Sequence, residues 1–377
     1  MIGGALLRPL MPMIRNDFGL SYTQSGWLMS AFSMTYGISQ LPAGWLADRF
    51  GARLIVLVSV TGVALAGLLI GFSNSFVTLV ILLVLAALLG GGYHPSSGAA
   101  IASSVPAEHR GRAFGLHFVG GTSAFWVVPL LAAPIAVAWG WRSSFFTLSI
   151  PIFLLGILLY ILIGRQGQNP IRETPASGVD APVEDTRVPW RKLVPIILLS
   201  VAIGTMIHSI SGYFSLYAVD NLGASESVAA MLMSIAPALG FVSAPVGGYL
   251  SDRFGSITVL LVIGFLAAPL VYLLGLASSI IALAALMGAV GIVSSMRVPI
   301  SESYITGNSP KHRRGTILGV YFFAGTEGSG VLTPVIGNLI DRVGFQSTFT
   351  IAAAVTGAVV VICSLFLWGN RNKRNIS

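Results

Sequence analysis

The chain has 377 residues, of which 55% are hydrophobic and only 9% are charged, and its mean hydropathy is +0.85. In a soluble domain about a quarter of all residues are charged. This composition therefore excludes a soluble globular protein and indicates an integral membrane protein. The net charge of +8 does not indicate a nucleic-acid partner, since the basic residues lie mainly in short loops between apolar runs, as the positive-inside rule describes.

The apolar runs predict helices that cross a bilayer. They are about 20 residues long or longer, which matches a hydrocarbon core of about 30 Å at 1.5 Å per residue, and they lack the alternation of barrel strands. We predict an all-α membrane protein with twelve transmembrane helices in two six-helix pseudo-symmetric halves. The predicted spans are 1–14, 22–47, 52–72, 76–104, 110–138, 142–164, 191–219, 225–250, 256–277, 279–306, 313–340 and 344–368.

A polar segment divides the chain into an N-terminal half at 1–164, a cytoplasmic linker at 165–190 and a C-terminal half at 191–377. The first span, 1–14, gives only about 21 Å of helix. We therefore expect that the chain begins inside its first helix, which is truncated relative to its counterpart in the second half.

The basic residues set the predicted orientation. Sixteen of the 21 Lys and Arg residues fall on one side of the predicted spans, three fall on the other side, and Arg8 and Arg297 lie inside spans. By the positive-inside rule, the linker and the C-terminus are expected in the cytoplasm of a multi-pass protein of the cell membrane.

The two halves repeat one another at a constant offset of 204 residues. The segment Gly44–Arg53 returns as Gly248–Ser256 with the same Asp-Arg-Phe-Gly core. Further pairs at this offset are Gly19 and Gly223, Pro95 and Pro299, Gly115 and Gly319, and Gly140 and Gly344. Internal repeats of this kind are typical of secondary transporters, whose substrate site lies near the middle of the membrane.

The motif Gly44-x-Leu-Ala-Asp48-Arg49-Phe-Gly51-x-Arg53 resembles the loop between the second and third helices of the major facilitator superfamily. The resemblance covers nearly the whole chain, and it implies alternating-access transport. It also implies that a cytoplasmic gate latches the outward-open state. The residues that match this gate are Gly44, Asp48, Arg49, Gly51, Arg53, Asp252 and Arg253.

Within that family, the runs Tyr93-His94-Pro95 and Arg110–Gly121 are similar to fosmidomycin-resistance-type exporters and related bacterial permeases. The chain departs from proton-coupled members, because Gly90–His94 stands where many of them carry an Arg. It also has Gly120-Gly121…Pro129 in place of the pattern associated with drug antiporters. Both departures weigh against proton-driven drug efflux.

Ionisable side chains within the bilayer usually face a cavity or a partner. The candidates for substrate binding or coupling are Arg8, Tyr93, His94, Arg297, Glu302 and Glu327. Arg297 lies midway along its span, where its guanidinium could grip a carboxylate or phosphate in fork geometry. The alternative is a structural ion pair of Arg297 with Glu302 or Glu327.

His94 suits proton coupling or substrate hydrogen bonding, because its ordinary pKa lies near neutrality, and an interhelical packing role is the alternative. Glu327 is the preferred proton carrier, unless it permanently neutralises Arg297. Arg8 could bind substrate or extend to the outer membrane surface.

The hypothesis that follows is transport of a small solute, an organic anion, coupled to protons. The alternatives are proton-driven efflux of drugs or toxins and a membrane sensor with the same fold. We expect no enzyme activity, no cofactor, no metal and no catalytic residue, because no Walker loop, metal cluster or nucleophile–base pair occurs in the sequence. The expected partners are a small-molecule substrate, the proton and the lipid bilayer, with the protein as a monomer.

Overall fold

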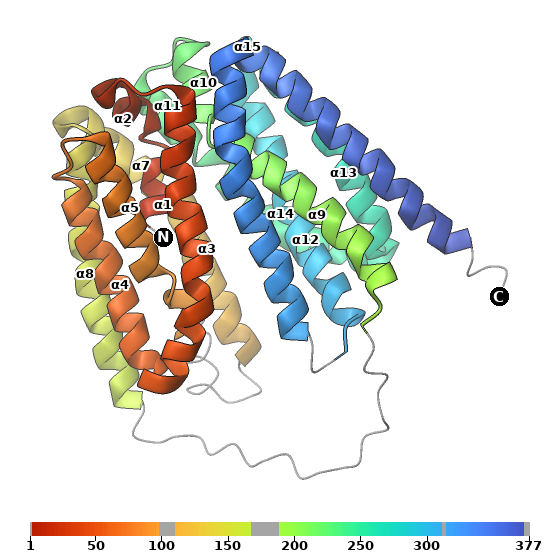
Figure 1. Ribbon diagram of the computed structural model, residues 1–377, viewed down its shortest axis with the longest axis horizontal. Helices are drawn as coiled ribbons and strands as arrows, with labels where there is room; N and C mark the ends of the chain where they lie inside the picture. Colours follow the sequence, from red (N-terminus) through yellow and green to blue (C-terminus); the bar gives the residue numbers. More distant parts are fainter. Residues whose placement is uncertain (1, 95, 98–109, 167–187, 311–313, 373–377) are drawn as a thin grey trace. The chain divides into compact units, whose positions relative to one another are not determined.

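A computed structural model describes residues 2–94, 96–97, 110–166, 188–310 and 314–372 (Figure 1). Helices account for all the regular secondary structure in these ranges, which confirms the predicted all-α class. The elements are α1 (Ile2–Leu7), α2 (Met11–Phe18), α3 (Tyr22–Phe50), α4 (Ala52–Ile70), α5 (Phe76–Gly90), α7 (Arg110–Trp139), α8 (Trp141–Gln166), α9 (Trp190–Ser211), α10 (Phe214–Asp220), α11 (Glu226–Leu232), α12 (Ile235–Phe254), α13 (Ser256–Gly275), α14 (Ile280–Gly307) and α15 (Arg314–Asn372).

Several predicted spans are interrupted in the structure. The first is divided into α1 and α2 by a turn at 8–10, the seventh into α9 and α10 near Gly212, and the eighth into α11 and α12 near Met233. By length and composition, eight stretches of the described chain are apolar enough to cross a membrane. The number twelve therefore stays a prediction.

The last long helix contains a sharp turn. In α15 the backbone leaves helical geometry at Gly344, where φ is 77° and ψ is 173°. Figure 1 shows the consequence, because the two arms of α15 meet at this point and run in different directions. The two arms correspond to the predicted spans 313–340 and 344–368.

Turns with positive φ occur at equivalent places in the two repeats. The described residues with positive φ are all glycines, and they form three pairs at the 204-residue offset: Gly19 with Gly223, Gly51 with Gly255, and Gly140 with Gly344. A residue with a Cβ atom is disfavoured in this conformation, so glycine fixes where each helix can end and the next can begin. The sequence repeat is thus also a repeat of backbone geometry.

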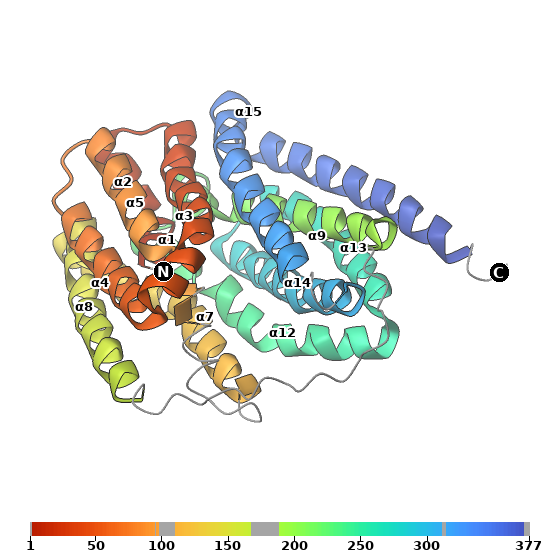
Figure 2. The ribbon, with the colours of Figure 1, turned by 60° about the horizontal axis from the view of Figure 1, so that its bottom comes forward.

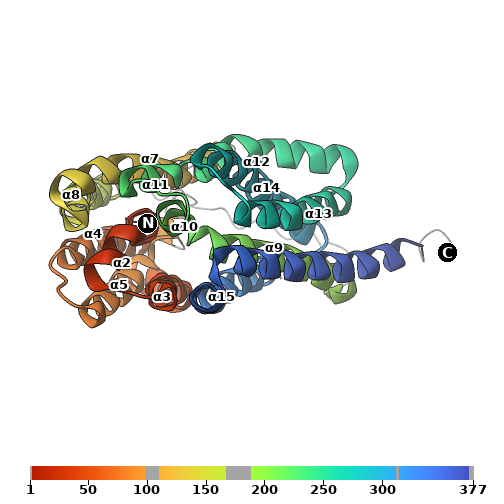
Figure 3. The ribbon, with the colours of Figure 1, turned by 90° about the horizontal axis from the view of Figure 1, so that it is seen from above.

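The chain forms two compact units. In the first unit, α4 packs against both α5 and α8, which Figure 3 shows from above. In the second unit, α14 packs on α12 and α13, and α15 packs on α9 and α13 (Figure 2). Two short segments are exchanged between the units, since Ser21–Gly26 belongs to the second unit and Ser225–Ser234 to the first. The division into halves at 1–164 and 191–377 stays a prediction, and most of the predicted linker at 165–190 lies outside the described residues.

Candidate functional site

Arg297 is held by one nitrogen of its guanidinium group. Its Nη1 atom lies 2.8 Å from the carbonyl oxygen of Ser200, 2.6 Å from the hydroxyl of Ser200 and 3.0 Å from the hydroxyl of Tyr321, and it donates to these acceptors. The two hydroxyls are 2.9 Å apart. Helices α9, α14 and α15 of the second unit thus fix the orientation of the arginine.

The anchor itself is buried and well supported. Ser200 and Ser301 have no exposed surface, and their hydroxyls are 2.7 Å apart. Tyr321 is 4% exposed and belongs to a buried apolar cluster with Leu193 and Ile317. Because the ring of Tyr321 is packed on apolar neighbours, its hydroxyl can serve as a fixed acceptor for Arg297.

The opposite edge of the Arg297 guanidinium makes no hydrogen bond to the part of the chain that the structure describes. Its Nε atom is buried and has no hydrogen-bond partner, and within the described residues no acceptor is bound to Nη2 either. These two N–H groups point the same way and form the fork that matches a carboxylate or phosphate. A buried donor without a partner costs about 1–3 kcal/mol, so this edge is suited to receive a ligand oxygen.

Gly204 on α9 leaves space for the guanidinium. A Cβ atom at this position would lie 2.5 Å from Nη2 and 2.7 Å from Cζ of Arg297. Any side chain at Gly204 would therefore push the arginine away from its anchor.

Two further buried oxygens in this unit lack hydrogen-bond partners. They are Oε1 of Glu327 on α15 and Oγ1 of Thr205 on α9. The two helices approach closely here, because a Cβ atom on Gly328 would lie 3.0 Å from Oγ1 of Thr205. Among the described residues Glu327 makes no ion pair with Arg297, whereas Glu302, the other carboxylate considered from the sequence, interacts with the charge of Arg297.

The equivalent positions of the first repeat carry a different chemistry. At the 204-residue offset, Arg297 corresponds to Tyr93 and Tyr321 corresponds to His117. The rings of Tyr93 and His117 stack with centroids 5.6 Å apart, and Nε2 of His117 lies 3.3 Å from the hydroxyl of Ser97. The first unit therefore presents stacked rings where the second presents a cation.

The other predicted binding residues are spread over both units. His94 is exposed and lies edge-on to Tyr36 and Tyr93, with ring centroids 6.3 Å and 5.7 Å away. Arg8 is half-buried in the turn between α1 and α2, and Glu302 is half-buried on α14, five residues after Arg297. The structure thus brings Arg297 together with serines and a tyrosine, and His94 together with aromatic rings.

In the predicted cytoplasmic gate, the arginines contact aromatic rings. Arg49 lies over the ring of Trp45, with Cζ 5.3 Å from the centroid, and Arg253 donates to the hydroxyl of Tyr249 at 3.3 Å. Arg53 donates from Nε to the carbonyl of Tyr160 at 2.8 Å. Gly51 supplies the positive-φ turn, as Gly255 does in the second motif.

The remaining gate residues are less informative. Asp252 is exposed at the end of α12. Gly44 and Asp48 lie in α3, and the surroundings of their side chains are outside what the structure describes.

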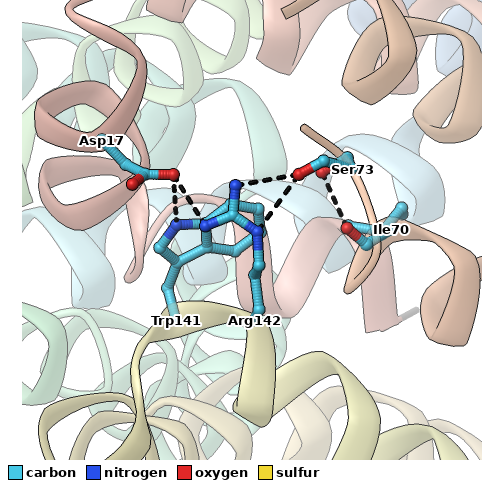
Figure 4. Close-up of polar contacts among 5 residues, drawn as sticks. All are labelled: Asp17, Ile70, Ser73, Trp141 and Arg142. Atoms are coloured by element: carbon cyan, nitrogen blue, oxygen red, sulfur yellow. Dashed lines mark hydrogen bonds and ion pairs between the residues drawn. The ribbon is translucent and has the colours of Figure 1, made fainter. Parts of the chain in front are cut away.

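A polar cluster at the opposite ends of the helices of the first unit was not predicted. Nη1 of Arg142 forms an ion pair with Oδ2 of Asp17 at 2.7 Å, and the indole N–H of Trp141 donates to the same oxygen at 3.3 Å (Figure 4). Nε and Nη2 of Arg142 donate to the carbonyl of Ser73 at 3.1 and 2.8 Å. This cluster connects α2 and α8 with the turn after α4, which is a structural role.

Ser200, Ser301 and Tyr321 were not identified from the sequence as partners of Arg297. Serines are common in membrane helices, so their composition gives no signal. The repeat offset does give a signal for Tyr321, because it aligns Arg297 with Tyr93, a predicted binding residue, and aligns Tyr321 with His117.

The apolar helices, their repeated turns and the fixed arginine define a multi-pass membrane protein of the secondary-transporter class. The model of the Major Facilitator Superfamily matches residues 1–269 and 196–376. The chain therefore belongs to the Major Facilitator Superfamily, and it is a transporter rather than an enzyme.

Relatives of similar length share between a quarter and a third of its residues. The chain is 26% identical over 382 residues to multidrug resistance protein MdtG of Salmonella arizonae, a match that covers 99% of the chain and 93% of the relative. It is 28% identical over 366 residues to MdtG of Proteus mirabilis, covering 94% and 89%.

Solved structures support the fold. A bacterial homolog of the human lysosomal transporter Spinster, inward-facing and unoccupied, superimposes with a TM-score of 0.75 at 18% identity, covering 97% of this chain and 92% of the other. A POT family transporter in complex with a thioalcohol conjugated peptide gives a TM-score of 0.78 at 14% identity, covering 96% and 92%.

Proposed function

We propose that this transporter exports small organic anions across the plasma membrane by alternating access, with the proton as coupling ion. The observation that carries the proposal is the unused fork edge of Arg297, a half-buried cation that is fixed by Ser200 and Tyr321 and whose Nε and Nη2 donors meet no acceptor among the described residues. A planar oxyanion such as a carboxylate, or a phosphonate oxygen pair, satisfies both donors at once.

Export rather than uptake is supported by the relatives. The proteins that match nearly the full chain are named multidrug resistance proteins. Such a name applies to proteins that remove compounds from a cell, and an anionic group is compatible with many toxic organic compounds. The distribution of basic residues supports a cytoplasmic C-terminus and a cytoplasmic linker. The proposed transporting unit is a monomer in the bilayer.

Glu327 is the proposed proton carrier. Its Oε1 atom is buried without a hydrogen-bond partner, so no fixed protein group competes with a proton for that oxygen. As the cavity alternates between the two sides of the membrane, the exposure of Glu327 changes, and the carboxyl group can bind a proton on one side and release it on the other.

A second candidate is efflux of uncharged or cationic drugs through the aromatic site of the first unit. The observation that favours it is the ring cluster of Tyr36, Tyr93, His94 and His117, which offers π-faces to flat or cationic ligands. In this alternative Arg297 serves only to hold α9, α14 and α15 together.

The two candidates can be separated in proteoliposomes. We expect transport of an anionic probe, carboxyfluorescein, to fall about a hundredfold in Arg297→Ala, because a bidentate charge-assisted contact is lost. Transport of a cationic probe, ethidium, should not exceed background in either protein. Ethidium transport that survives Arg297→Ala while carboxyfluorescein is not moved by the unmodified protein would reject the anion proposal.

The same assay tests coupling. With Glu327→Gln, a pH gradient should no longer accelerate efflux of carboxyfluorescein, whereas exchange of the probe at equal pH should persist. An unchanged response to the gradient would contradict the role of Glu327.

A further inference from the structure

The first turn of α3 is bound by residues that are far away in the sequence. The segment Ser21–Gly26 belongs to the second compact unit, although the rest of α3 belongs to the first. Within the turn, the N–H of Gln24 donates to Oγ of Ser21 at 3.1 Å, and the N–H of Ser21 donates to Oε1 of Gln24 at 2.9 Å. This capping box leaves the next two backbone N–H groups, those of Tyr22 and Thr23, in need of acceptors.

Asp341 supplies both acceptors. Its carboxylate accepts hydrogen bonds from the N–H of Tyr22 at 3.0 Å, from the N–H of Thr23 at 2.8 Å and from the hydroxyl of Thr23 at 2.5 Å. A carboxylate at a helix N-terminus is favoured both by hydrogen bonding and by the helix dipole. Asp341 ends the first arm of α15, three residues before the turn at Gly344, and is 318 residues from Thr23.

Tyr22 makes further contacts with the same unit. Its hydroxyl donates to Oδ2 of Asp220 at 2.6 Å, and its ring lies edge-on to Phe345 with centroids 5.0 Å apart. Two glycines permit the close approach of the backbones. A Cβ atom on Gly26 would lie 2.8 Å from Cα of Pro334, and one on Gly337 would lie 2.5 Å from the carbonyl oxygen of Tyr22.

Among the described residues, the equivalent segment of the second repeat makes fewer hydrogen bonds to distant parts of the chain. Ser225–Ser234 belongs to the first unit, where α11 packs on α7 and Nδ2 of Asn16 donates to Oε1 of Glu226 at 2.7 Å. Under the 204-residue offset, this pair corresponds to Asp220 and Tyr22, so the two contacts are related by the repeat. Asp341, however, corresponds to Val137, and no carboxylate can cap α11 from that position.

We propose that the contact of Asp341 with Tyr22 and Thr23, here called the Asp341 clasp, is a releasable fastening that sets the rate at which the outer side of the transporter opens. The clasp fastens the end of α3 that lies opposite to the Asp48–Arg53 motif, which is the outer end in the orientation proposed above. This proposal rests on the alternating-access part of the proposed function and does not depend on the charge of the substrate.

The chemistry of the clasp suits repeated opening. Its hydrogen bonds are exposed, so water can replace each acceptor when the helix end moves away. At the glycine contacts the backbones close over the hydroxyl of Tyr213, a fully buried residue that donates to the carbonyl oxygen of Tyr22 at 3.3 Å, so opening of the clasp also breaks this bond. A contact of this kind slows the movement of the helix end and can still be broken and re-formed in each transport cycle.

Cysteine accessibility tests the proposal without any substrate. The chain has a single cysteine, Cys363, which is buried in α15, so Cys363→Ser provides a cysteine-free background. In that background, Thr23→Cys reports on the clasp, and Thr78→Cys, an exposed position in the first turn of α5, serves as the matched control. A membrane-impermeant maleimide labels each cysteine in proteoliposomes.

Adding Asp341→Ala should raise the labelling rate of Thr23→Cys about tenfold, because two charge-assisted acceptors of the helix end are removed. The labelling rate of Thr78→Cys should not change. An equal labelling rate with and without Asp341 would overturn the proposal, as would a parallel increase at both positions.

A crosslink tests the requirement for opening. Bridging Thr23→Cys and Asp341→Cys with a short, reducible bis-methanethiosulfonate reagent should stop transport of any solute that the unbridged protein moves, and reduction should restore it. The control bridge joins Asp17→Cys and Arg142→Cys, which lie together in the first unit, and should leave transport active. Undiminished transport with the Thr23–Asp341 bridge in place would refute the clasp, and this result is distinct from a failure of the anion proposal.

Discussion

The two repeats of this transporter share their turns and differ in their polar contacts. Three pairs of positive-φ glycines occur at the 204-residue offset, and so do the capping serines, since Ser75 accepts from the N–H of Thr78 at 3.2 Å and Ser279 accepts from that of Ala282 at 3.2 Å. Backbone geometry has therefore been retained in both halves, because a wrong turn would misdirect a whole helix.

The differences lie where side chains meet. The carbonyl of Ser73 in the first repeat accepts from Arg142, whereas the equivalent carbonyl of Ala277 in the second accepts from the hydroxyl of Tyr217 at 2.9 Å. Near the middle of the helices, a stacked pair of rings in one repeat corresponds to an anchored arginine in the other. The comparison teaches that the shared features specify the fold, and that the diverged side chains are where the transport specificity of this chain should be sought.

The largest effect on the comparison is expected from Arg142→Gln, which gives the first repeat the residue that the second has at Gln346. The carbonyl of Ser73, a fully buried residue, loses both its donors, and Asp17 loses its ion pair. We expect a loss of about 2 kcal/mol of stability. Thermal unfolding of the detergent-solubilised protein measures it.

The control is Arg342→Gln, which removes an exposed arginine of the second repeat and should change the unfolding midpoint little. Equal midpoints for the two variants would show that the Arg142 cluster contributes nothing to stability.

A smaller loss of stability is expected from Gly140→Ala and Gly344→Ala, which change glycines at equivalent turns of the two repeats. Gly140 and Gly344 have φ values of 82° and 77°, and an added Cβ atom would meet no neighbour at either site. The penalty is therefore conformational only, about 1–2 kcal/mol at each position, and the two variants should lower the unfolding midpoint to a similar extent.

Gly120→Ala is the matched substitution for this test, because Gly120 lies within α7 and also has open space around its Cα. It should be neutral or slightly stabilising. A large difference between Gly140→Ala and Gly344→Ala would mean that the turns are not equivalent.

The smallest effect is expected from Tyr321→Phe, which removes one of the acceptors of Arg297 and leaves both oxygens of Ser200. The arginine keeps its charge but is oriented less firmly. We expect the KM for carboxyfluorescein to rise about threefold with a smaller change in kcat, equivalent to the loss of one weak hydrogen bond.

Tyr272→Phe, at an exposed position on α13, should leave both constants unchanged. If Tyr321→Phe behaved like it, the hydroxyl of Tyr321 would have no part in positioning Arg297.

The positions of the long helices could largely be predicted from the sequence. The predicted span 256–277 agrees with Ser256–Gly275, and 279–306 agrees with Ile280–Gly307, because hydropathy averaged over about 20 residues reports burial in lipid. The break near Gly212 could not be predicted in the same way. It depends on a local turn, in which the N–H of Tyr213 donates to the carbonyl of Ile210, and on the hydroxyl of Tyr213 reaching the carbonyl of Thr333.

The candidate site was predicted in part. Arg297 could be identified because a charged side chain is costly within the bilayer and usually faces a cavity or a partner. This argument does not depend on which residues surround the arginine. The choice between a carboxylate partner and neutral hydroxyls could not be made, since it depends on which face of α9 turns toward α14. Ser200 lies on that face, and only the three-dimensional arrangement reveals it.

The exchange of Ser21–Gly26 and Ser225–Ser234 between the compact units has a consequence for how the chain can be divided. A cut in the linker would give two fragments, and each would lack the short segment that its own unit takes from the other repeat. The cap that Asp341 provides would be left without its helix, and α7 would lose the cover of α11. In this molecule the boundary along the sequence and the boundary in space do not coincide, so each half depends on the other for its completion.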